Sequence, residues 1–225
     1  MRYLYTLLLI ALFVIIGGPV EAKKRARKRS FKHAPVVYVI DTFSDKNLTS
    51  KPEWWALGHV TAGVESNDDV LSPKYVGGYS LVFQAQAKRW YAGGIGSYLG
   101  IDASPYKAIK LVVYSPSANA SIVTVQLFDD DNHNWEIDID NATQKVTEDD
   151  IFVSSFQLDW EGWKVVTLPL SKFDDDNYGV GDDIWNPSRR DGSGGLVQIQ
   201  LLAFSQKTKM GLVEFRLDSL KLVGK

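Results

Sequence analysis

Side-chain amides and indole rings are the groups whose types and spacing in this sequence could do chemistry. Glutamines alternate with apolar residues in three stretches, as Gln84 and Gln86, as Gln126, and as Gln198 and Gln200. Alternate residues of an extended strand share one face, so these amides would point outward while the apolar residues enter a core. Planar amides make paired hydrogen bonds to hydroxyl groups, and aromatic rings stack on the C–H face of a pyranose. The pattern is typical of a surface that binds sugars.

Tryptophans supply the candidate stacking partners. Trp135 and Trp185 lie in polar loops near the glutamine-bearing strands, where such a ring would sit. We therefore predict one ligand-binding set: Gln84, Gln126, Trp135, Trp185, Gln198 and Gln200. The alternative is that glutamine only suits a solvated strand face and that the tryptophans belong to the core.

Groups for catalysis show no comparable order. The three histidines, His33, His59 and His133, lack metal-binding spacing and a paired nucleophile, and the chain has no cysteine. Carboxylates are abundant, as glycosidases require. However, the aspartate runs at 129–131 and 174–176 sit in polar stretches, where exposed charge is the ordinary expectation. We predict a protein that binds rather than catalyses.

Short strands are the elements that must position the amides. The clearest is a hairpin of 108–114 and 121–128, in which Val123 and Val125 point one way and Gln126 points the other. Further strands are expected at 36–40, 79–87, 98–101, 135–139, 151–158, 162–170, 196–204 and 211–223. No stretch of ten residues in the body keeps the 3.6-residue apolar period of a helix. The pattern predicts an all-β sandwich, of the jelly-roll type.

The glycine-rich run 93–96 (GGIG) is not a phosphate loop, because no Lys-Ser/Thr ending and no helical pattern follow it. It predicts a bulged strand or a close approach of another chain segment to the backbone.

Two acids flank the ends of the expected sandwich. Asp41 follows the first strand and Asp218 lies in the last one, and these strands are often neighbours in a jelly roll. Carboxylate oxygens from such a pair, with backbone carbonyls, would suit a structural calcium ion. We predict Asp41 and Asp218 as metal ligands.

The N-terminal segment is expected to direct export. Residues 1–22 combine a positive start, an apolar run and a small residue at the expected cleavage point, which predicts a signal peptide. Residues 23–35 hold seven lysines and arginines up to position 32, and this block could instead mark a membrane anchor of reversed orientation. It is either a solvated linker or an arm that docks on an anionic surface or on a second copy of the chain.

The body of the chain is acidic. Without Arg2, Glu21 and the seven basic residues of 23–32, 17 basic and 26 acidic side chains remain, a formal charge of about −9. Nucleic-acid binding is therefore not expected. We predict a single domain over 36–225 in a secreted or periplasmic protein.

Four stretches carry a family resemblance: VIDTFSD from Val39, the hairpin YKAIKLVVYSPSANASIVTVQLF from Tyr106, WEGWKVVTLPLSKF from Trp160 and VEFRLDSLKLV from Val213. They resemble the galactose-binding-like jelly rolls, a group with carbohydrate-binding modules and complex-I intermediate-associated domains. The resemblance implies core positions for Trp163 and Phe173 and a calcium site at the early and late acids. Thr42 stands where a second acid is common, which departs from the pattern.

The sequence thus predicts a non-catalytic, exported protein that binds a polysaccharide or glycan on one sheet face. Periplasmic flagellar filament sheath proteins resemble the same jelly roll and carry a signal peptide. Assembly into such a structure is the alternative function.

Overall fold

A computed structural model of the protein describes residues 36–206 and 211–224. The predicted signal peptide (1–22) and basic arm (23–35) lie outside the described residues. Within the described ranges, no helix is long and apolar enough to cross a membrane.

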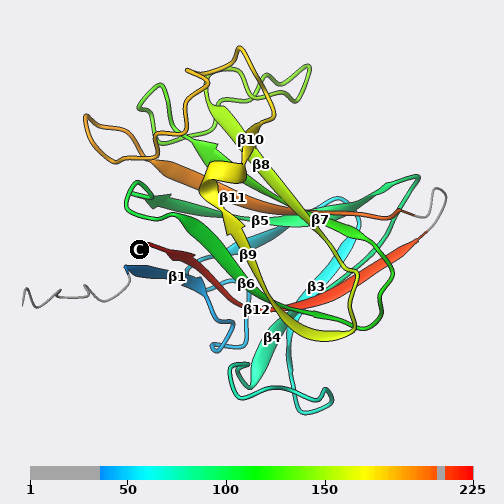
Figure 1. Ribbon diagram of the computed structural model, residues 1–225. Helices are drawn as coiled ribbons and strands as arrows, with labels where there is room; N and C mark the ends of the chain where they lie inside the picture. Colours follow the sequence, from blue (N-terminus) through cyan, green and yellow to red (C-terminus); the bar gives the residue numbers. More distant parts are fainter. Residues whose placement is uncertain (1–35, 207–210, 225) are drawn as a thin grey trace, which may run out of the picture. The chain divides into compact units, whose positions relative to one another are not determined.

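The described chain folds into two antiparallel β-sheets, which Figure 1 shows as two layers. The first sheet has the order β3-β4-β12-β6-β9, with β1 paired to β12. The second sheet has the order β10-β8-β7-β11-β5-β2. The predicted all-β sandwich is confirmed.

The strands are short and joined by loops. The first sheet contains β1 (Val37–Asp41), β3 (Val60–Ser66), β4 (Tyr79–Gln86), β6 (Ala108–Ser115), β9 (Gly162–Pro169) and β12 (Leu212–Val223). The second sheet contains β2 (Trp54–Leu57), β5 (Tyr91–Ile101), β7 (Ile122–Asp129), β8 (Asp150–Gln157), β10 (Asp174–Asp175) and β11 (Leu196–Phe204). One 3-10 turn, η1 (Leu170–Lys172), follows β9.

The core is built from the inward residues of both sheets. On β7, Val123, Val125 and Leu127 are each at most 1% exposed, as the alternation predicted. From the first sheet, Phe83 and Phe215 stack in the same core with their ring centroids 4.6 Å apart. Each fully buried side chain of this size contributes about 1.5–3 kcal/mol by leaving water, which is why the alternation fixes which face of β7 points outward.

Three expectations about elements are corrected. Strands β2 and β3 were not predicted, because they are short and β3 mixes apolar with polar residues. Residues 135–139 form a loop rather than a strand, and Trp135 has a left-handed φ of 68°. Trp163 lies half-buried beside Tyr114 on the outer face of the first sheet, 5.3 Å away between ring centroids, whereas Phe173 does pack against the core.

Candidate functional site

The outer face of the second sheet carries a row of polar and aromatic residues that crosses four strands. Gln126 on β7 is the direct partner of Gln200 on β11. Gln200 in turn pairs with Gly96 on β5, and Gly96 pairs with Trp55 on β2. The inward neighbours of these residues belong to the core, so the row itself faces outward.

A glycine makes room for the indole ring in this row. A Cβ atom on Gly96 would lie 2.8 Å from three atoms of the Trp55 ring, so the ring lies directly against the backbone of β5. Tyr98 stands next to it, with the ring centroids 4.9 Å apart and the planes 45° from each other. Tyr98 is 62% exposed and Trp55 is half-buried. We name Trp55 and Tyr98 the ring pair. The close approach predicted for the glycine run is confirmed at Gly96.

Two depressions lie along the same face. The first, which we name the glutamine groove, has a volume of about 600 Å³, and its floor includes Gln126, Phe128 and Gln200. Its walls come from the loops 139–146 and 176–180, where Tyr178 is 85% exposed. The second depression, of about 690 Å³, is lined by the ring pair and by residues 38–40 and 51–53. The amides therefore lie at one end of the row and the ring pair at the other.

The structure brings three of the four predicted glutamines together. Gln126 and Gln200 are half-buried in the groove, and Gln198 lies one row along, between Phe128 and Tyr98. Gln198 is only 6% exposed, so it is less available than the other two. Gln84 is elsewhere: it belongs to β4 of the first sheet, where its amide donates to the carboxylate of Glu214 at 2.9 Å. The expectation that Gln84 shares the sheet face of the others is wrong.

The two predicted tryptophans lie in loops rather than on the strands of this face, and the Trp135 ring lies against Gly100 near the end of β5. The Trp135 indole N–H donates to the carbonyl of Gly192 at 2.7 Å, and the Arg189 guanidinium covers its ring at 4.0 Å. Trp185 packs edge-on against Phe152 with their centroids 5.3 Å apart. Both rings hold loops in place, and a role of either in ligand binding stays a prediction.

The ring pair that flanks the glutamines is not part of the predicted ligand-binding set. Trp54 and Trp55 read as a loop, yet they alternate as an inward and an outward residue of β2. Trp54 is buried in the core at 6% exposure, which leaves Trp55 on the outer face. The signal that could have found Trp55 is the pair Gly94 and Gly96, because glycines spaced by two clear one face of a strand for a large neighbour.

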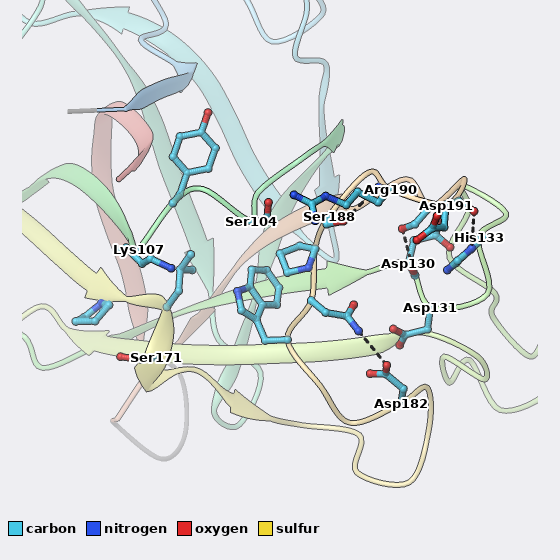
Figure 2. A pocket seen from close by; sticks show the side chains of 17 residues that line it. Ser104, Lys107, Asp130, Asp131, His133, Ser171, Asp182, Ser188, Arg190 and Asp191 are labelled. Atoms are coloured by element: carbon cyan, nitrogen blue, oxygen red, sulfur yellow. Dashed lines mark hydrogen bonds between the residues drawn. The ribbon is translucent and has the colours of Figure 1, made fainter. Parts of the chain in front are cut away.

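A third cavity, of about 820 Å³, lies at one end of the sandwich and is shown in Figure 2. Trp185 lines it, together with His133 and charged residues that include Asp130 and Arg190. The carboxylate of Asp130 accepts three backbone N–H groups, from residues 134, 135 and 194, so it serves to hold loops. The His133 ring lies 3.0 Å from the carbonyl of Asp191.

The carboxylates of the predicted calcium ligands, Asp41 and Asp218, accept hydrogen bonds from nearby N–H groups. Strands β1 and β12 are neighbours, as predicted. Asp41 accepts the Phe43 N–H at 2.7 Å and the Trp54 indole N–H at 2.8 Å, and burial raises the pKa of this carboxyl. Asp218 accepts the backbone N–H groups of residues 77 and 219, at 2.7 and 2.6 Å. Each oxygen of the pair already accepts one N–H group, and calcium binding at Asp41 and Asp218 stays a prediction.

Acidic side chains gather in a different place, at the loops that follow β7 and β10. Burial, together with the nearby carboxylates of Asp131 and Asp150, raises the pKa of Asp129 to about 8. Burial also raises the pKa of Asp149 to about 6. The aspartate runs 129–131 and 174–176 are thus partly buried, and the expectation of merely exposed charge is wrong for several of their members.

Comparison with known proteins supports the fold. Two solved structures of the family 11 carbohydrate-binding module from Clostridium thermocellum are similar to this chain at 16% identity. One is in complex with a β-1,3-1,4-mixed-linked tetrasaccharide and has a TM-score of 0.50, with 85% of this chain and 97% of that chain covered. The other is the module of the cellulosomal cellulase Lic26A-Cel5E, with a TM-score of 0.51 and coverage of 85% and 96%. No protein-family model and no curated protein sequence matches the chain. The fold is a β-sandwich similar to that of these two modules.

Proposed function

We propose that the protein binds a polysaccharide or glycan on the outer face of the second sheet, without catalysis. The observation that carries this proposal is the row formed by Gln126, Gln200, Gly96 and Trp55, with Tyr98 beside the indole. Amides separated by one strand spacing, about 4.8 Å, can each bond to hydroxyls of one sugar unit. The ring pair presents an apolar surface to the C–H face of the next unit.

The shape of this face supports an extended ligand. The glutamine groove and the depression at the ring pair lie at the two ends of the same row of residues. Both are open, so a chain of several sugars can lie across them with its ends in solvent. A mixed-linked β-glucan is the first ligand to try, because the fold is similar to a module solved with a tetrasaccharide of that kind.

We further propose that the protein acts outside the cytoplasm, where polysaccharides occur. The support is the signal-like segment 1–22 of the sequence. Neither of the two similar structures is a filament protein, so they do not support the assembly function. Assembly stays an alternative prediction.

Retention on immobilised polysaccharides tests the binding proposal. The mature chain should be run through gels that contain mixed-linked β-glucan, xylan or mannan. Trp55→Ala should weaken retention at least tenfold, because stacking a ring on sugar removes apolar area worth about 1.5–3 kcal/mol from water. Gln126→Ala together with Gln200→Ala should do the same while the melting temperature stays nearly constant.

The matched control is Gln84→Ala, which removes the same amide from the outer face of the first sheet. Its retention should equal that of the unchanged protein. Equal losses from Gln84→Ala and from the Gln126 and Gln200 variants would refute the assignment of the face. No retention on any polysaccharide would refute the proposed function.

A further inference from the structure

Five aspartates from distant parts of the chain meet near the third cavity, and we name them the acid cluster. They are Asp131 after β7, Asp150 at the start of β8, Asp175 on β10, and Asp182 and Asp183 in the loop that follows. They form two triads that share Asp150, and within each triad the carboxylate oxygens lie within 4.8 Å of one another. Figure 2 shows two of them, Asp131 and Asp182, at the end of the cavity.

Two carboxylate oxygens of the cluster, Asp150 Oδ1 and Asp175 Oδ2, are buried without a hydrogen-bond partner among the described residues. Asp150 is fully buried at 0% exposure. Its other oxygen, Oδ2, accepts the N–H of Ile184 at 3.1 Å. A buried acceptor without a donor is costly. A cation or a proton beside Oδ1 would remove this cost.

The Oδ1 atom of Asp150 points into the cluster. A Cβ atom on Gly181 would collide with both Asp150 Oδ1 and Asp131 Oδ2, so the two oxygens converge on the backbone of this glycine. Gly181 has a left-handed φ of 72° and no side chain to fill the space. The absence of a Cβ lets the loop with Asp182 and Asp183 approach the carboxylates closely.

Within 36–206 and 211–224, no basic side chain forms an ion pair with the cluster. Among the residues that the structure describes, the ion pairs join Lys164 with Asp159, and Arg216 with Glu65 and Asp69, all away from the cluster. Like charges in a partly dry site repel each other unless a proton or a cation lies between them.

We propose that the acid cluster binds a calcium ion, with Asp150 as the ligand common to both triads. Carboxylate oxygens are the ligands that hard divalent cations prefer, and calcium accepts six to eight of them in flexible geometry. Magnesium would demand a near-octahedral set with several waters, which five crowded carboxylates match less well. The cavity gives the ion a path from solvent to Asp131 and Asp182.

The ion would tie the wall of the glutamine groove to the sheet. The segment 176–180, which forms that wall, lies between Asp175 and Asp182. Asn177 already joins it to β8, because its side chain accepts the Ile151 N–H and donates to the Asp149 carbonyl, each at 2.7 Å. Calcium between Asp150 and the aspartates on both sides of this segment would fix it at its two ends.

Calorimetric titration of the chelator-stripped mature protein with calcium chloride tests the proposal. We expect saturable binding and a higher melting temperature with calcium. Asp150→Asn should abolish both effects, and without calcium it should be at least as stable as the unchanged protein, because it removes a buried charge. Asp174→Asn, an exposed neighbour outside both triads, should keep the full response.

Asp182→Asn is the second variant, because Asp182 is exposed and its replacement leaves the buried part of the cluster intact. It should weaken calcium binding at least tenfold. The proposal is overturned if the unchanged protein shows neither binding heat nor a thermal shift with calcium. It is also overturned if Asp150→Asn and Asp182→Asn both respond to calcium as the unchanged protein does. A shared proton between Asp131 and Asp150 would give the first of these results. The experiment measures binding heat and melting temperature and not glycan retention, so its outcome does not depend on the proposed function.

Discussion

Gly96 and Trp55 together shape the outer face of the second sheet. Gly96 lies between Gln200 and Trp55 in the row, and its missing side chain is filled by the indole ring. The position is within a strand, where glycine usually weakens the sheet by about 0.5–1 kcal/mol relative to alanine. A destabilising residue that seats an aromatic ring on a solvent-facing surface indicates a binding platform.

Gly96→Ala is therefore expected to damage binding more than its size suggests. The added methyl group would lie 2.8 Å from the ring of Trp55 and force it off the backbone of β5. We expect weaker glycan retention, several-fold or more, and a loss of stability of about 1–3 kcal/mol from overpacking. Gly63→Ala on β3 is the control, because nothing lies within 4 Å of its added Cβ. Similar behaviour of the two variants in retention and urea unfolding would show that the ring is free to move.

At the scale of elements, strand β7 separates the two roles of the sheet. Leu127→Ala removes a side chain that is 0% exposed and leaves a cavity between the sheets. Its free energy of unfolding should fall by about 2–5 kcal/mol. Thr124→Ala, on the outward side where its hydroxyl lies 2.8 Å from that of Ser155, should change it by about 0.5 kcal/mol or less. Urea denaturation measures both, and equal losses would contradict the assigned faces.

The same strand shows how far sequence reasoning reaches. Alternation on β7 and β11 predicted the inward valines and leucines and the outward Gln126 and Gln200, because period-two patterning is local. The ring pair was not predicted, since Trp55 meets Tyr98 only through the pairing of β2 with β5. The acid cluster was missed for the same reason. Its members are up to 52 positions apart, from Asp131 to Asp183, and only the tertiary fold gathers them into one partly buried group.

At the scale of the whole molecule, the proposed glycan-binding face and the proposed calcium site occupy different places. The amides and the ring pair lie on an open sheet face, whereas the acid cluster lies among the loops at the edge of that sheet. Figure 1 shows these loops above β10, β8 and β11. Loss of calcium should then affect the groove only through the wall at 176–180, and the depression at the ring pair should keep its shape.

The charge of the chain predicts a final property. Residues 23–32 hold seven basic side chains, and the chain from His33 onward carries a formal charge of about −9. We expect the mature chain to self-associate at low ionic strength, arm to acidic body. At 0.1 M salt the screening length falls to about 10 Å, so exposed charges attract each other less and the monomer should dominate. Analytical ultracentrifugation at 10 and 300 mM NaCl measures the change.

A variant in which the seven lysines and arginines of 23–32 become glutamine is the matched control, because it keeps the length of the arm and removes its charge. It should remain monomeric at both salt concentrations. An association that survives 300 mM NaCl, or that persists in the glutamine variant, would mean that contacts other than the arm's charge join the copies. In that case the ring cluster of Trp90, Tyr91 and the half-buried Phe204 is the next surface to test. Trp90 is 61% exposed and stacks on Phe204 with their centroids 5.1 Å apart.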